Sequence, residues 1–339
     1  MKSILLMFLC MYLPVTALAE PVVITAVGDI MLSGSGERVF KKLGYDYPFD
    51  ATREILKSSD IVTGNLEAPL AANGVEFTEK KFRFKTAPKA ATSLKNAGFN
   101  HLTLANNHIL DFGVEGLEQT LAALDAIKIT HSGAGLDLSD ARKASVVEVK
   151  GVKIALLSYS LTYPDEFFAG SARPGAAPGY ASIYVADIRK AKESVDCVIV
   201  SFHWGGEGLE SPKPYQLSVA HNAVDAGADI VLGHHPHVLQ GVEYYGKGII
   251  FYSLGNFAFG SLSRTSSQSM IARIVFDGGL KEVEIIPLNV RNSEVRFQPR
   301  PLEGRQARKA AEAVNFLSAP MGSRVTDVDG RFLVVRQND

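Results

Sequence analysis

Three histidines lie within four residues of this chain, in the segment Gly233-His234-His235-Pro236-His237. The segment directly follows a short apolar run that ends at Leu232 and is typical of a buried strand. Imidazole is the commonest protein ligand for zinc, iron, manganese and related metals, and a strand end holds such ligands on a rigid support. The cluster therefore predicts a metal site. The alternative is a solvated polar turn that happens to be rich in histidine.

Polar residues of the same kind follow four earlier apolar runs. They are Asp29, then Asn65 with Glu67, then the segment Asn106-Asn107-His108, and finally His203. If the strands are parallel, all five ends lie at one edge of a sheet and can converge on one point. Mixed oxygen and nitrogen ligands suit zinc, manganese or iron better than calcium. We therefore expect one or two divalent ions at this edge.

The elements that must position these residues alternate between strands and helices. Strands are expected at 22–27, 60–64, 100–105, 196–202 and 229–232, and helices at 49–57, 88–96, from 113, at 182–194 and at 213–226. Such alternation predicts an α/β fold with a largely parallel sheet covered by helices.

Three pairs of β runs interrupt this alternation. Residues 144–158, 241–253 and 270–290 are each expected to form two strands, and residues 169–179, rich in glycine, proline and alanine, a long mobile loop. The tail is expected to contain one helix and a short strand. We expect a signal peptide at 1–19, the main domain at 20–298 and a C-terminal helix/strand extension at 299–339.

The first residues resemble a secretory leader. Lys2 precedes an apolar run at 4–13, and Ala17-Leu18-Ala19 fits a small-x-small cleavage pattern. The run is too short to be a convincing membrane span, and an uncleaved anchor is the alternative. The leader predicts export, with cleavage after Ala19, to a bacterial periplasm or cell surface.

Charge and cysteine content exclude some classes of protein. The formal net charge is −1, and the loss of Lys2 with the leader makes it one unit more negative. This near-balance argues against a general nucleic-acid binder, so an anionic ligand must meet a local basic patch. After cleavage Cys197 is the remaining cysteine, so no intramolecular disulfide is expected.

One basic segment is a candidate for that patch. Lys81, Arg83 and Lys85 alternate with phenylalanines, and on a strand they share one face. Such a row suits a polyanion, for example a chain of glutamates, whereas the alternative is a solvated edge strand protected by lysines. Trp204 follows His203 directly and either forms a wall of the pocket or packs in the core.

Six motifs in this order make the chain resemble the CapA family of the calcineurin-like metallophosphoesterase superfamily. The resemblance covers about residues 23–259, and its motifs are Gly28-Asp29-Ile30-Met31-Leu32, Asn65-Leu66-Glu67, Ala105-Asn106-Asn107-His108, His203-Trp204-Gly205, Gly233-His234-His235-Pro236-His237 and Ser253-Leu254-Gly255-Asn256-Phe257. It implies a calcineurin-like sandwich of mixed, largely parallel sheets flanked by helices. The family is linked to poly-γ-glutamate capsule biosynthesis.

The resemblance also implies roles for individual residues. His108 would act on the leaving group beside Asn107, and Asn256 would contact substrate. The metal ligands would be Asp29, Asn65, Glu67, Asn107, His203, His235 and His237. His234 with His237 is the alternative histidine pair, but alternate residues of an extended turn point the same way, which favours His235 with His237. For His108 the alternative is a helix-capping residue.

Two departures from the superfamily pattern affect the metal count. Asp29 is followed by Ile30 and Met31, where the superfamily has Asp-x-His. Asn65 stands at the position of a bridging aspartate, and a neutral amide is a poor bridge between two cations. Glu67 is the candidate replacement, so one-metal and two-metal sites both stay open.

Two functions follow. The first is an exported metal-dependent hydrolase of phosphoester or amide bonds, acting on an anionic polymer such as poly-γ-glutamate, where the cation polarises the attacked bond. The second is a non-catalytic, metal-containing subunit that binds the polymer within a capsule synthesis complex at the membrane. The missing first-motif histidine favours the second function, and the Asn107-His108 pair favours the first.

Overall fold

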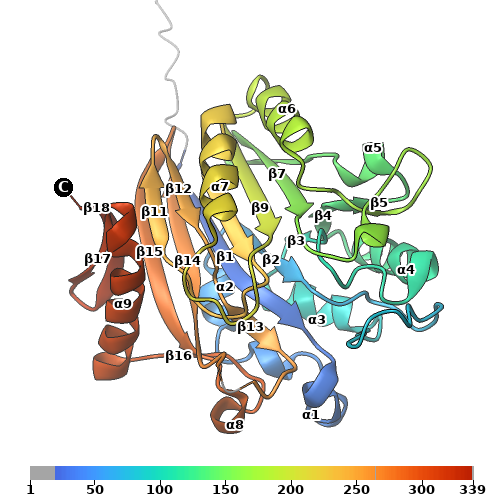
Figure 1. The fold of residues 1–339 in the computed structure, drawn as a ribbon. Helices are drawn as coiled ribbons and strands as arrows, with labels where there is room; N and C mark the ends of the chain where they lie inside the picture. The colour runs from blue at the N-terminus through green and yellow to red at the C-terminus, as the bar shows by residue number, and fades with distance from the viewer. Residues whose placement is uncertain (1–19, 264, 338–339) are drawn as a thin grey trace, which may run out of the picture.

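The computed structural model describes residues 20–263 and 265–337, so the predicted leader lies outside the described residues. Within them the chain forms two large mixed sheets that pack face to face, with helices on both outer faces (Figure 1). The predicted α/β sandwich is confirmed. Among the described residues, none of the helices combines the length and hydropathy that a membrane crossing requires.

The first sheet has ten strands in the order β17-β18-β15-β14-β1-β2-β3-β4, with β13 beside β1 and β16 beside β15. Neighbours of β1 on the β2 side are parallel, whereas β14 to β18 are antiparallel. The strands are β1 Val22–Met31, β2 Ile61–Leu66, β3 His101–Thr103, β4 Thr130–Ser132, β13 Asn256–Phe259, β14 Gln268–Phe276, β15 Leu280–Asn289, β16 Arg300–Pro301, β17 Ser323–Val328 and β18 Arg331–Arg336.

The second sheet has six strands in the order β11-β12-β10-β9-β7-β6. Its inner strands are parallel, and the hairpins β6–β7 and β11–β12 add an antiparallel strand at each edge. The strands are β6 Ser145–Val149, β7 Val152–Ser160, β9 Cys197–His203, β10 Ile230–His234, β11 Val242–Tyr245 and β12 Gly248–Phe251; β5 Ala134–Gly135 and β8 Gly175–Ala176 form a separate small pair.

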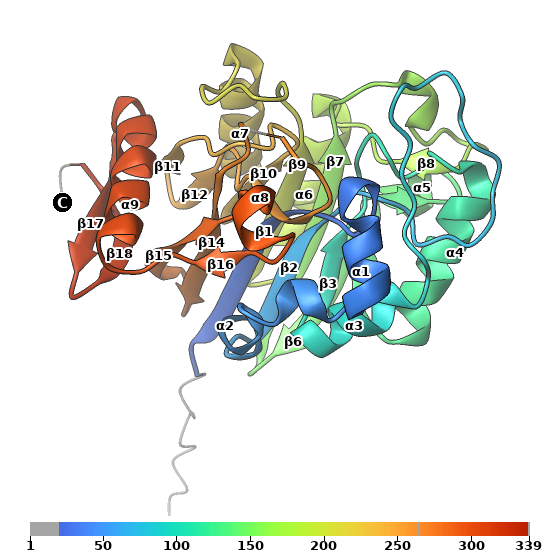
Figure 2. The ribbon, with the colours of Figure 1, turned by 90° about the horizontal axis from the view of Figure 1, so that it is seen from below.

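Helices cover the two outer faces of the sandwich (Figures 1 and 2). Helices α1 to α4 pack on the first sheet, α5 to α7 pack on the second, and α9 packs against β15, β17 and β11. The bounds are α1 Glu37–Leu43, α2 Arg53–Lys57, α3 Ala90–Ala97, α4 Gly113–Ala126, α5 Leu138–Ala141, α6 Ala181–Lys192, α7 Pro214–Ala226, α8 Asn292–Val295 and α9 Gly304–Ser318.

The apolar runs of the sequence are explained by burial on both faces of each strand. In β9, Cys197 and Ile199 point into the core between the sheets, whereas Val198 and Val200 point toward the helices. Successive side chains of a strand alternate between its faces, so a strand covered on both sides has no polar alternation. Cys197 is accordingly a buried free thiol of this core.

The predicted elements mostly form, with three differences. Strands β1, β2 and β10 run past their expected ends to include Asp29, Asn65 and His234, because these polar residues pair in the ladders. The tail contains two strands, not one, and β18 extends the first sheet beside β15. The strand expected at Lys81 to Lys85 is wrong, since this segment is a loop.

Glycine is required where strand ends approach each other closely. A Cβ at Gly233, just before the histidines, would lie 2.0 Å from the carbonyl oxygen of Tyr252. The backbones of Gly233 and Tyr252 are both closely packed, so neither can shift to relieve the overlap without a large cost in free energy.

We therefore expect Gly233→Ala to lower the free energy of unfolding by about 3 kcal/mol. Gly170→Ala is the matched control, because its Cβ would lie 3.5 Å from the Cβ of Arg173, an ordinary contact. Urea denaturation of both variants measures the difference. Equal stabilities would contradict the close approach.

Candidate metal centre

The polar strand ends of both sheets meet at one place. Asp29 pairs with Asn65 of β2 on one side and with Asn256 of β13 on the other. His203 and His234 are paired at the ends of β9 and β10 in the second sheet. The sequence predicted one shared sheet edge, whereas the residues converge from two sheets, where β1 packs against β10.

Asp29 is the most heavily contacted carboxylate of the cluster. It is fully buried, and it accepts hydrogen bonds from Asn65 Nδ2 at 2.9 Å and from the His235 backbone N–H at 3.1 Å. Nitrogens of His234 and His237 each lie 3.2 Å from its oxygens. Burial raises the pKa of Asp29, but these two histidines outweigh it and hold the pKa well below its usual value.

Asn65 links the two carboxylates of the first sheet. Its Nδ2 lies 2.9 Å from Asp29 Oδ1 and 3.2 Å from Glu67 Oε2. Asn106, for which the sequence predicted no role, donates to Asn65 Oδ1 at 3.0 Å. This hydrogen bond sets the orientation of the Asn65 amide. Asn65 therefore presents a donor, not an acceptor, toward the centre of the cluster.

Glu67 is buried with an unused oxygen. Its Oε1 has no hydrogen-bond partner and lies 3.7 Å from His203 Nε2 and 3.5 Å from His237 Nε2. Burial and the charge of Asp29 raise the pKa of Glu67 well above its ordinary value. A buried carboxylate oxygen without a partner costs free energy unless a cation or a proton satisfies it.

The histidines of the turn are held in strained backbone. His235 has φ of 91° and His237 has φ of 58°, a region that residues other than glycine rarely adopt. Burial lowers the pKa of His235 to about 3, so its imidazole is neutral, and its Nδ1 has no partner. Burial acts on His237 in the same sense, but Glu67 and Asp29 raise its pKa to about 10.

These side chains fit a divalent cation. Three overlapping groups each bring three ligand atoms within 4.8 Å of one another: Glu67 with His203 and His235, Asp29 with Glu67 and His237, and Glu207 with His235 and His237. Oxygen and imidazole donors of this kind match transition metals, and Glu67 and His235, which share one of these groups, each have a buried atom without a hydrogen-bond partner. Asn107 Oδ1 lies 3.0 Å from His203 Nε2, beside the first group.

His108 is held by residues that the sequence interpretation missed. Asp111, fully buried, accepts from His108 Nδ1 at 2.6 Å, which fixes the tautomer with the lone pair on Nε2. Lys80 donates to the other oxygen of Asp111 at 2.6 Å and to the Asn107 carbonyl oxygen. Burial lowers the pKa of His108, although the Asp111 carboxylate opposes this.

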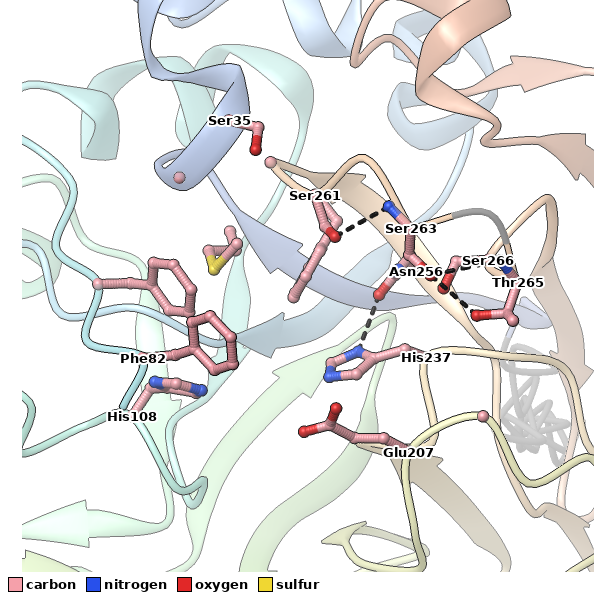
Figure 3. A pocket seen from close by; sticks show the side chains of 16 residues that line it. Ser35, Phe82, His108, Glu207, His237, Asn256, Ser261, Ser263, Thr265 and Ser266 are labelled. Atoms are coloured by element: carbon pink, nitrogen blue, oxygen red, sulfur yellow. Dashed lines mark hydrogen bonds between the residues drawn. The ribbon is translucent and has the colours of Figure 1, made fainter. Parts of the chain in front are cut away.

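A cavity of about 630 Å³ opens beside the cluster. Figure 3 shows His108 and Phe82 on one side of it and His237 and Glu207 on the other. Asn256 also lines the cavity, and its Oδ1 accepts a hydrogen bond from His237 Nδ1 at 2.9 Å, which is compatible with its predicted contact to substrate. The cavity gives a substrate access to both His108 and the candidate ligands.

Three other predicted substrate residues make their contacts outside the cavity. Trp204 is fully buried, stacks on Phe202 and donates to the Tyr252 carbonyl oxygen, so it is corrected to a core residue. Arg83 pairs with Glu76, and Lys85 donates to the Ala72 carbonyl oxygen. The predicted basic row is absent from this described loop, because its residues share no strand face.

Lys81 is exposed near the mouth of the cavity, with its ammonium 5.2 Å from the ring centre of Phe82. Phe82 lines the cavity, so the Lys81 ammonium lies against a cavity-lining ring. Neither Lys80 nor Asp111 was predicted from the sequence to be a site residue. Asp111 follows His108 at an interval of three residues, a spacing that favours contact between the two side chains.

Solved structures with the same fold include nucleotidases. NAD nucleotidase of Haemophilus influenzae is 14% identical, with a TM-score of 0.50 over 86% of this chain and 62% of that one. A putative 5′-nucleotidase of Staphylococcus aureus is 12% identical, with a TM-score of 0.50 over 87% of this chain and 58% of that one. The chain thus spans less than two thirds of their length. The likeness shows that the chain shares the fold of these nucleotidases.

The family is narrower than the fold. The model of the bacterial capsule synthesis protein PGA_cap matches residues 23–261. Capsule biosynthesis protein CapA of Bacillus anthracis is 34% identical over 84% of this chain and 70% of its own length. PGA biosynthesis protein CapA of Bacillus subtilis is 36% identical over 79% of this chain and 71% of its own length. The chain belongs to this CapA capsule synthesis family.

Metal binding is expected to stabilise the folded chain. Mn²⁺ at about 100-fold above its dissociation constant should raise the melting temperature of metal-stripped protein by about 5 °C. Glu67→Gln should lose most of that shift, while its metal-free form should be at least as stable as wild type, because the repulsion from Asp29 is removed. Differential scanning calorimetry with and without Mn²⁺ measures both effects.

His131→Ala is the control, because His131 pairs with Asp125 away from the cluster. It should keep the full Mn²⁺ shift. No shift in wild type, or an equal shift in Glu67→Gln, would show that the cluster does not hold the ion.

Proposed function

We propose that the chain is an exported, metal-dependent hydrolase that cleaves phosphoester bonds during synthesis of a capsule polymer of the poly-γ-glutamate type. One observation carries this proposal. The unpartnered Oε1 of buried Glu67 lies among imidazole nitrogens, one of which, His203 Nε2, contacts Asn107. The next residue, His108, is oriented by a buried carboxylate. A buried structural site does not need an oriented histidine at the wall of an open cavity.

We infer that Glu67 takes the place of the bridging aspartate. It belongs to two of the three candidate donor groups, one with Asp29 and His237 and one with His203 and His235. A carboxylate shared by two groups can neutralise part of the charge of two cations, which the Asn65 amide cannot do. This supports two neighbouring ion positions with Glu67 between them.

A cation bound there would polarise a phosphoryl oxygen and stabilise negative charge that develops during hydrolysis. The chain itself supplies the remaining functions. Asp111 counteracts the effect of burial and so stabilises the imidazolium form of His108. After Nε2 has taken up a proton, it donates this proton to the leaving oxygen. Asn256 and Glu207, which line the cavity near His237, contact the substrate.

The polymer assignment rests on the family. The curated relatives of Bacillus anthracis and Bacillus subtilis carry the names capsule biosynthesis and PGA biosynthesis protein. An anionic polymer, or an intermediate that carries it, is therefore the proposed substrate. The leader-like first 19 residues support export to the periplasm or cell surface, where a membrane-bound capsule complex is the proposed partner.

A non-catalytic role is the second candidate. It is favoured by Asn65, whose donor group lies between the carboxylates where a bridging anion is expected. In this role the same residues hold a cation, and the cavity only binds the polymer.

His108→Ala separates the two roles. In Mn²⁺-loaded protein we expect kcat for bis(p-nitrophenyl) phosphate to fall by about 10²- to 10⁴-fold, because the proton donor is lost. The metal content should stay unchanged. Release of p-nitrophenol and the bound metal are measured on the same preparation, and His221→Ala, which pairs with Glu243 outside the cavity, is the control.

The opposite result is equally clear. If wild type and His108→Ala bind metal but are equally inert on this diester and on γ-glutamyl-p-nitroanilide, the hydrolase proposal fails. The binding subunit is then the better account.

A further inference from the structure

We propose that Phe82 and Phe84, called here the aromatic platform, bind a ring-bearing group of the substrate next to the bond that His108 acts on. This inference rests on the proposed function and adds the chemical class of the bound group. It concerns a flat ring with an apolar face, such as an aryl or a sugar ring. It differs from the expectation that basic residues of the same segment bind carboxylates.

The platform continues outward from the candidate proton donor. The ring centre of Phe84 lies 5.1 Å from that of His108. The ring centre of Phe82 lies 6.4 Å from that of Phe84, and the planes of the two rings are within 4° of parallel. Both phenylalanines and His108 line the same cavity, and Figure 3 shows Phe82 on the same side of it as His108. A ring that stacks on the platform therefore lies next to His108.

The two rings differ in how they are covered. Phe84 packs against the cluster of Met31, Ala68 and Phe259, which anchors it. Phe82 is 61% exposed at the cavity. An anchored inner ring with an exposed, parallel outer ring provides a stacking surface whose position is already set, so little conformational entropy is lost on binding.

One neighbour of Phe82 must be displaced or shared. The Lys81 ammonium lies 5.2 Å from the ring centre and is itself exposed. A ligand ring can take the place of the Lys81 ammonium on Phe82 while the ammonium stays in solvent, so the free-energy cost of displacing it is small. Lys81 then remains near a phosphate attached to that ring.

A single carboxylate aligns the platform with His108. Asp111 Oδ2 accepts from the Phe84 backbone N–H at 2.8 Å and from His108 Nδ1 at 2.6 Å. Its Oδ1 accepts from Lys80, which belongs to the same loop as the platform. The loop at 72–85 has no helix or strand to hold it in place, so Asp111 fixes both the bound ring and the proton donor in one frame.

The class of ligand follows from these contacts. An open chain of γ-linked glutamates contains no ring, so it gains nothing from two stacked phenylalanines. A phosphoester with an aryl or sugar ring gains stacking free energy beside the cation site. We infer that the bound group is chemically different from the polymer repeat, as in an activated precursor or a carrier-linked intermediate.

Binding of two phosphonates tests the platform without requiring turnover. In Mn²⁺-loaded wild type, phenylphosphonate should bind about five- to tenfold more tightly than methylphosphonate by isothermal titration calorimetry. Phe82→Ala should abolish this preference without weakening methylphosphonate binding, and Phe82→Trp should retain it. Phe316→Ala is the control, because Phe316 is 78% exposed on α9, outside the cavity.

Turnover gives an independent readout. The ratio of wild-type to Phe82→Ala kcat/KM should be about five to ten for phenyl phosphate and for glucose 1-phosphate, and about one for glycerol phosphate. The ratio removes the intrinsic reactivity of each ester. A larger ratio for phenyl phosphate identifies an aryl ring as the preferred group, and a larger ratio for glucose 1-phosphate identifies a sugar.

The platform proposal is overturned if wild type binds the two phosphonates with equal affinity. It is also overturned if Phe82→Ala weakens the binding of both phosphonates by the same factor. Binding with the expected preference but without turnover of any ester supports the platform and contradicts the hydrolase. Absence of binding by both phosphonates contradicts both.

Discussion

The site depends on the balance of charge between two buried carboxylates and the histidines around them. Asp29 keeps its charge because His234 and His237 lie against it, whereas Glu67 is pushed toward its neutral form by burial and by Asp29. Without a cation, His237 holds a proton between the two carboxylates, and its pKa rises to about 10. A divalent ion at this place would stabilise both carboxylates more strongly than one proton does, because it carries more charge. The Oε1 of Glu67, which has no hydrogen-bond partner, is therefore the feature that favours metal binding.

The fold maintains this arrangement by bringing two sheets together at their strand ends. Close backbone packing at Gly28 and Gly233 lets the loops of the two sheets meet, and a Cβ at either position would overlap a backbone carbonyl. The strained backbone at His235 and His237 then turns their rings toward the carboxylates of the other sheet. Bringing Asp29, Glu67 and the histidines together in a buried place costs free energy. The apolar cores on both faces of the sheets offset this cost.

Much of the fold and the family could be predicted from the sequence, because both depend on local patterns. Six motifs in order indicated the family, and the two strands expected at 144–158 form the hairpin β6–β7. The contact of Lys80 with Asp111 could not be predicted, because it joins a loop to a residue 31 positions away and no periodic pattern marks it. The alternation of basic and aromatic residues around Phe82 was misinterpreted as a strand, since alternation has no meaning without a partner strand. The roles of the site residues stay predictions.

The most direct test of the cation site is a crystal structure of the mature chain grown with Mn²⁺, with anomalous data collected for manganese. The account predicts an anomalous peak in contact with Glu67, His203 and His235, a second in contact with Asp29, Glu67 and His237, and loss of both peaks in Glu67→Gln. A map without peaks at this cluster, at a Mn²⁺ concentration that saturates the protein by calorimetry, would contradict the account.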